Sequence, residues 1–189
     1  MLFAAIQYAT RCEATLGCAS PVNHDICGFD RAEPCEEGEP SVSMSCTTVT
    51  VEGDATRLIS FSAQQGGDSS IAVADLAVPV TGGTPTPGGS CRVTVQEGAS
   101  TYSGSCGGDA PSEAQPCQIS NVEFYDDRGN PTVSARISCR FLASEASPDL
   151  EIEVTDLGAG PGAAGTAGRI RIANCPGLTC SPETCSPAP

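Results

Sequence analysis

The stretch Cys91-Arg-Val-Thr-Val-Gln-Glu-Gly-Ala-Ser-Thr-Tyr-Ser-Gly-Ser-Cys106 has the pattern of a complete β-hairpin. Apolar and polar residues alternate on both sides of the tip Glu97–Ser100, as they do in strands with one buried face. A cysteine stands at each end, so the two Cβ atoms can face each other across the paired strands, as a disulfide requires. We therefore predict a hairpin that is closed by a Cys91–Cys106 disulfide.

The same alternation recurs on both sides of this hairpin, between clusters of Gly, Pro, Asp and Asn that favour turns. No long stretch has helical periodicity, and short strands at regular spacing are typical of sandwiches and barrels. We predict an all-β fold, a disulfide-rich antiparallel β-sandwich of Greek-key or jelly-roll type. The predicted strands are Val42–Val51, Leu58–Ala63, Ile71–Val80, Cys91–Gln96, Thr101–Cys106, Cys117–Tyr125, Thr132–Leu142, Leu150–Thr155 and Arg169–Ala173.

The distribution of apolar, cysteine and proline residues divides the chain into four segments. Residues 1–10 are an apolar N-terminal segment, residues 11–40 a cysteine-rich stapled loop region, residues 41–175 the β-sandwich, and residues 176–189 an irregular Pro/Ser/Cys tail. A faint likeness between cysteine-bearing strands leaves open two tandem sandwiches that divide near residues 107–116. We favour one domain, because each half alone would bury little surface.

The chain has twelve cysteines and no Cys-x-x-Cys pair. A structural zinc site or an iron–sulfur cluster needs such close ligand pairs, so we predict disulfides. Disulfides persist in oxidising compartments, and we expect an extracellular or cell-surface protein. The pairing beyond Cys91–Cys106 stays open. The predicted disulfide cysteines are Cys12, Cys18, Cys27, Cys35, Cys46, Cys91, Cys106, Cys117, Cys139, Cys175, Cys180 and Cys185.

The net charge of −14 argues against a nucleic-acid partner, because the phosphate backbone would be repelled. All nine basic residues are arginine. No segment approaches the roughly 20 apolar residues that span a bilayer, so no transmembrane segment is expected. The apolar N-terminus lacks the basic region of a signal peptide, and we expect the chain to be the mature form of an exported protein.

The residues needed for common catalytic mechanisms are missing or badly placed. His24 is the only imidazole, and its position in a polar loop predicts a surface side chain. Glu151 and Glu153 alternate with apolar residues, so both should face solvent on one strand, and Glu97 and Glu123 are expected to do the same. Motifs for serine hydrolases, zinc proteases and phosphate loops are absent from the sequence. We therefore expect neither an enzyme nor a cofactor.

Two further segments bear on ligands. Asp126, Asp127 and Asn130 supply oxygen donors that suit calcium, as does the acidic run Glu33–Glu39, but Asp126–Asn130 also has the composition of an ordinary hairpin tip. The glycine-rich stretch Leu157–Gly168 lacks the strand and helix that flank a nucleotide loop, and we expect a flexible surface loop there.

The N-terminal segment has two interpretations. Leu2, Phe3, Ile6 and Tyr8 can belong to an ordinary first strand of the sandwich. Alternatively, they can complete the sheet of a neighbouring subunit, a mode that is similar to the donor strands of chaperone–usher pilins, although no motif places the chain in that family. Repeated head to tail, such donation builds a filament.

Function is therefore expected to be structural. We predict an exported homopolymer, the repeating subunit of an extracellular filament, pilus-like fibre or surface layer. The alternative is a monomeric cell-surface binding or adhesion module that holds a protein, glycan or calcium with loops such as Gln64–Ser70 or Tyr125–Asn130.

Overall fold

The computed structural model describes residues 2–12, 22–26, 35–36, 42–51, 55–87, 89–146, 151–155, 167–181 and 183–187. This part of the chain contains strands and no helix, so it has no helix that could cross a membrane. The strands are β1 Phe3–Cys12, β2 Val22–Ile26, β3 Cys35–Glu36, β4 Val42–Thr50, β5 Thr56–Gln65, β6 Ser69–Pro79, β7 Arg92–Glu97, β8 Ser100–Gly107, β9 Cys117–Asp127, β10 Asn130–Ser144, β11 Glu151–Thr155, β12 Gly168–Ala173 and β13 Ser186–Pro187.

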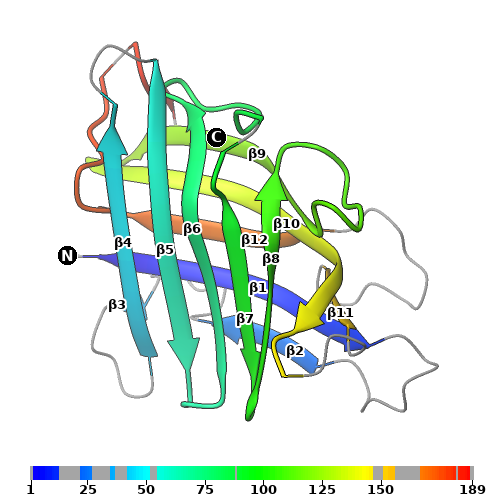
Figure 1. Cartoon of the computed structure of the whole chain (residues 1–189). Coiled ribbons are helices and arrows are strands. Elements are labelled where there is room, and N and C mark those ends of the chain that lie inside the picture. Colours follow the sequence, from blue (N-terminus) through cyan, green and yellow to red (C-terminus); the bar gives the residue numbers. More distant parts are fainter. Residues whose placement is uncertain are drawn as a thin grey trace.

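The strands form one hydrogen-bonded, mostly antiparallel sheet that folds over into two layers (Figure 1). The front layer is a meander of β4 to β8, in which each strand pairs with the next. The back layer contains β9, β10, β12 and β1, and its strands run at a steep angle to those in front. The predicted all-β sandwich is confirmed, and the described strands share one sheet.

The predicted strands between residues 42 and 173 correspond to β4 through β12. The hairpin of β7 and β8 has the predicted register, with Glu97 opposite Ser100 at its tip. Strands also occur where none was expected. Val22–Ile26 and Cys35–Glu36 lie in the segment taken as loops, and Ser186–Pro187 lies in the tail.

Strand β1 is an internal strand of its own sheet. Residues Phe3–Gln7 pair with β12 and Ala9–Cys12 with β11, while β3 and β2 pair along the opposite edge. Ile6 and Tyr8 are fully buried in the core. In the structure the segment is therefore an ordinary strand of its own sheet. This pairing does not support its donation to a neighbouring subunit. A sequence pattern could not decide this, because either partner satisfies the same alternation.

Strands β11 and β12 lie end to end and together fill one row of the sheet, that is, one strand position, between β1 and β10. Thr155, the last residue of β11, is opposite Ala9, and Arg169 of β12 is opposite Gln7. Buried and half-buried residues alternate from Ile152 to Thr155. The alternation continues from Gly168 as if Thr155 and Gly168 were consecutive residues. Only glycine fits at position 168, since an added Cβ would lie 2.8 Å from the Gln7 carbonyl oxygen and 2.9 Å from the Tyr8 Cβ.

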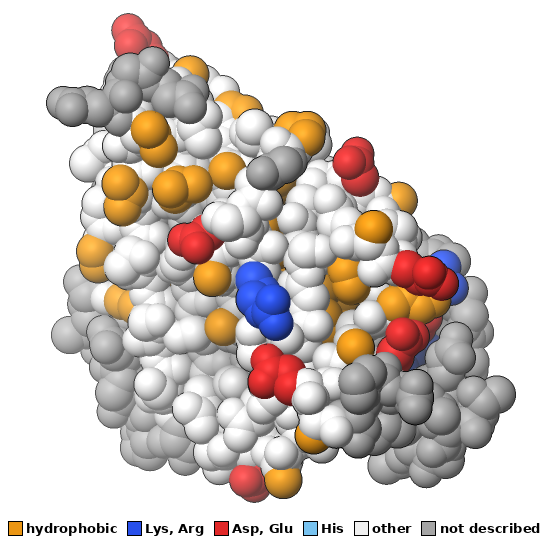
Figure 2. Space-filling model, in the orientation of Figure 1, with side chains coloured by type: hydrophobic (Ala, Val, Ile, Leu, Met, Phe, Trp, Pro, Cys, Tyr) orange, Lys and Arg blue, Asp and Glu red, His pale blue; other side chains and the backbone are white. Residues whose placement is uncertain are grey.

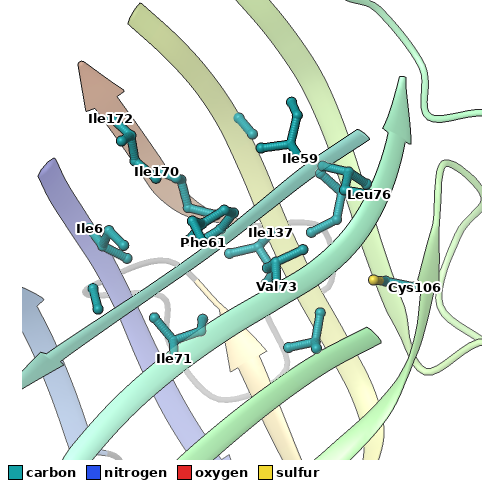
Figure 3. Close-up of a cluster of buried hydrophobic side chains, with 14 of the residues drawn as sticks. Ile6, Ile59, Phe61, Ile71, Val73, Leu76, Cys106, Ile137, Ile170 and Ile172 are labelled. Atoms are coloured by element: carbon teal, nitrogen blue, oxygen red, sulfur yellow. The ribbon is translucent and has the colours of Figure 1, made fainter. Parts of the chain in front are cut away.

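The core lies between the two layers. Aliphatic side chains from both layers interdigitate around Phe61, including Ile71 and Val73 from the front and Ile137 and Ile170 from the back (Figure 3). Such burial is the main stabilising contribution to the fold.

Four disulfides connect described cysteines. Cys91–Cys106 forms as predicted; the others are Cys46–Cys175, Cys117–Cys139 and Cys180–Cys185. The side chains of Cys12 and Cys35, and all of Cys18 and Cys27, lie outside the described residues. The observed disulfides indicate an oxidising compartment.

Three β-bulges bend the sheet, and each has a non-glycine residue with a left-handed backbone. These residues are Asp75 on β6, Asn121 on β9 and Phe141 on β10, with φ of 52°, 50° and 60°. A bulge adds one residue to a strand, increases its twist and redirects a side chain. Strand β10 curves toward the front layer in Figure 1, and its last residues pair with β8.

Candidate functional site

The outer face of the back layer, turned away from the viewer in Figure 1, contains a hollow of about 370 Å³. We call it the arginine hollow. Its charged members come from three adjacent strands, the consecutive strands β9 and β10 and the sequence-distant strand β12. The lining residues are Asn121, Glu123 and Tyr125 of β9, Ser134, Ala135 and Arg136 of β10, and Arg169, Ile170 and Arg171 of β12.

Strand alternation places the arginines on this face. Ala135 and Ile170 are buried on the core side, so Arg136, Arg169 and Arg171 project outward. Arg136 is the direct cross-strand partner of Arg169, so two arginines are neighbours on this face of the sheet. Directly opposed like charges destabilise a sheet. Within the described part of the chain, the side chain of the half-buried Arg136 makes no ion pair or hydrogen bond.

Arg171 is held differently from Arg136. Its guanidinium donates to the Asp127 carboxylate and to the Tyr125 phenol. Burial raises the pKa of Tyr125, Arg171 opposes this increase, and the Asp127 and Glu123 carboxylates add to it. The phenol is therefore a neutral hydrogen-bonding group at physiological pH.

The bulge on β9 shapes the hollow. Ser120 is opposite Arg136 and Glu123 is opposite Ser134, so Asn121 and Val122 together face one residue of β10. Val122 enters the core, and Asn121 is added to the outer face beside Glu123. Asparagine adopts the left-handed backbone more readily than most residues, so the bulge adds a polar side chain to the hollow.

His24 was expected at the surface, and that expectation is wrong. It lies on β2, is 8% exposed and stacks on Tyr8 with ring centroids 4.6 Å apart. Its Nε2 lies 2.7 Å from Glu97 Oε1, at the tip of the β7–β8 hairpin, and 3.4 Å from Thr10 Oγ1. The contact of Tyr8 and His24 with Glu97 joins the back layer to the front layer. Since both rings are buried, we interpret it as a structural contact.

The predicted calcium residues have other roles at the β9–β10 turn. Asp126 accepts a hydrogen bond from the Gly129 amide, and Asp127 pairs with Arg171. The Asn130 side chain donates to the Asp127 carbonyl oxygen at 3.0 Å. Among the described residues, no three His, Cys, Asp or Glu side chains are grouped closely enough to hold a metal ion. The run Glu33–Glu39 falls almost entirely outside the described residues.

Of the remaining predicted site residues, Tyr125 and Glu123 line the arginine hollow and the others lie elsewhere. Glu151 and Glu153 lie on the solvent side of β11, as expected, and Glu153 Oε1 is 3.4 Å from Arg140 Nε. Tyr125, in one of the two predicted binding loops, lines the arginine hollow, whereas Gln64–Ser70 forms the β5–β6 hairpin tip.

The arginines of the hollow were not predicted from the sequence. The alternation Arg169-Ile170-Arg171 was visible and places two arginines on one face of a strand. Their nearness to Arg136 depends on the pairing of β10 with β12, which no local pattern specifies.

Comparisons with family models, curated proteins and solved structures gave no match to this chain. The function must therefore be inferred from the residues and their geometry.

Proposed function

We propose that this protein is an exported binding module that holds an anionic group of its ligand in the arginine hollow. The observation that carries the proposal is the pair Arg136 and Arg169, which face each other across two strands. A bound anion would offset their repulsion, because a guanidinium binds carboxylate or phosphate oxygens with paired hydrogen bonds.

The charge distribution supports this proposal. The chain has 23 acidic and 9 basic residues, yet three of its arginines line one hollow. A hollow with a local excess of positive charge attracts anions even on an acidic protein, because nearby charges dominate at short range. Asp127 fixes Arg171 in place, and such pre-organisation reduces the entropy lost on binding.

The filament hypothesis has less support. One of its supports was residues 1–10 as a donor strand, and β1 (Phe3–Cys12) is paired on both edges within its own sheet. A polymer of this chain would need a different contact. Sedimentation at high concentration tests this point, and regular polymers would favour the structural role over the binding module.

Small anions test the hollow directly. In protein with ¹⁵N-labelled arginines, titration with acetate or phosphate should shift the Nε–Hε resonances of Arg136 and Arg169 in a saturable way. Arg136→Gln should abolish saturation at Arg169. Arg128→Gln is the matched control, because it removes the same charge from the exposed β9–β10 turn. Shifts that do not saturate, or that persist unchanged in Arg136→Gln, would falsify the proposal.

A further inference from the structure

A second hollow of about 330 Å³ adjoins the arginine hollow. The two share Asn121 and Glu123, so they lie side by side at the β9 bulge, and together we call them the groove. We call the new part the glycine–threonine hollow. Its lining residues are Thr81, Gly82, Gly83, Thr84, Asn121, Val122 and Glu123.

The turn after β6 is fixed against the bulge. The Gly83 amide donates to the Val122 carbonyl oxygen at 2.6 Å, and the Gly82 amide donates to the Pro79 carbonyl oxygen at 2.8 Å. A Cβ at Gly82 would lie 2.6 Å from that Val122 oxygen, and Gly82 has a φ of +83°, so glycine is required for this approach. The second hollow is therefore a built feature of the surface.

The chemistry of the two hollows differs. Asn121 and Glu123 line both hollows, but the arginine hollow adds three guanidinium groups, whereas the glycine–threonine hollow adds only hydroxyl groups and backbone. Hydroxyl, amide and carboxylate groups suit a neutral partner rich in hydroxyls, because each can donate to or accept from it. A second acidic group in the glycine–threonine hollow would be repelled by Glu123, because no arginine lines that hollow to offset the carboxylate. The groove therefore suits a ligand with an acid at one end and a neutral polyol beside it.

On the basis of the proposed function, we propose that the groove binds an acidic oligosaccharide. The carboxylate of one sugar would lie against Arg136 and Arg169, and the adjoining neutral sugar would occupy the glycine–threonine hollow. Each hollow is near the lower end of the roughly 300–1,000 Å³ range of ligand pockets, which suits small units. A peptide is less suitable, because the second hollow has little apolar surface for side chains.

Calorimetric titration with defined probes tests this inference. The probes are N-acetylneuraminic acid, sialyllactose, glucuronic acid, a hyaluronan tetrasaccharide, lactose and the peptide Gly-Glu-Gly-Gly. At least one acidic oligosaccharide should bind about tenfold or more tightly than its own acidic monosaccharide. Lactose alone should not bind, because it lacks the anion.

Two variants test whether the tighter binding of the oligosaccharide depends on the groove. Thr81→Phe fills the second hollow from an exposed position and should remove the oligosaccharide gain while leaving monosaccharide binding intact. Thr81→Ser is its control. Arg136→Gln should weaken both kinds of ligand, and Arg128→Gln neither. Thermal unfolding of each variant would establish that it is folded.

The outcomes separate the two proposals. Equal affinity for monosaccharide and oligosaccharide, or tighter binding of the peptide, overturns the acidic-oligosaccharide inference and leaves anion binding intact. Failure of every probe, together with unsaturated acetate and phosphate titrations, overturns both.

Discussion

The two layers of the sandwich are built differently. The front layer is a meander of consecutive strands, and its outer face presents mainly Ser, Thr, Ala and Gln with few charges (Figure 2). On this face Ser45 Oγ and Ser62 Oγ, from directly paired residues, lie 2.8 Å apart. The back layer combines strands from both ends of the chain, and it contains the arginine hollow. Pairing of consecutive strands gives the front layer a regular surface with few charges. In the back layer, the pairing of β10 with the distant strand β12 brings arginines together.

The largest effect is expected from separating the layers. Cys46 on β4, at the edge of the front layer, is bonded to Cys175, which follows β12 of the back layer. The bond closes a sequence separation of 129 residues, so the double variant Cys46→Ser/Cys175→Ser should lose about 5 kcal/mol of unfolding free energy. Urea unfolding measures the loss.

The Cys180–Cys185 disulfide provides the control. It spans only 5 residues, and its double serine variant should lose about 2 kcal/mol. Equal losses in the two variants would mean that the layers do not depend on the Cys46–Cys175 link.

A second contact between the layers should make stability depend on alkaline pH. Tyr8 of the back layer is fully buried, and burial together with the Glu97 carboxylate raises the pKa of its phenol. The unfolded chain then releases this proton at a lower pH than the folded protein does. Stability should fall as pH rises above about 10, by about 1.4 kcal/mol per pH unit for this group.

The variant Tyr8→Phe removes this dependence. Urea unfolding from about pH 8 to about pH 11 should give a flatter curve for Tyr8→Phe than for the natural chain. Parallel curves would show that Tyr8 does not contribute to alkaline unfolding.

The contrast between the layers also explains which features could be predicted from the sequence. The β7–β8 hairpin and its disulfide depend on residues close together in the chain, and both were predicted. The pairing of β1 with β12, and of β10 with β12, joins segments far apart in sequence. Alternation identifies these strands without identifying their neighbours. His24 was misassigned for the same reason, because the Tyr8 ring and the Glu97 carboxylate beside it come from β1 and β7.

A smaller effect is expected from removing residues 156–167. Thr155 and Gly168 stand at consecutive positions of one row, and burial continues in phase across them. Joining these residues directly should therefore preserve the back layer and change the unfolding free energy by less than about 1 kcal/mol. Deleting 155–167 instead shifts the alternation by one residue and should prevent folding. If both deletions behave alike, the two strands do not continue one row.

The smallest effect tests whether the arginine hollow costs stability without a ligand. Arg136 opposes Arg169, so Arg136→Gln should raise the unfolding free energy of the ligand-free protein by about 0.5 kcal/mol. The gain should shrink in about 1 M salt, where the screening length is about 3 Å. Arg128→Gln removes the same charge from the exposed turn and should leave stability unchanged. A loss of stability in Arg136→Gln would mean that the folded protein already holds this guanidinium favourably.

With a saturating anionic ligand the order of stability of the two proteins should reverse, because binding stabilises only the chain that retains Arg136. Such a reversal would distinguish a residue kept for binding from one kept for the fold.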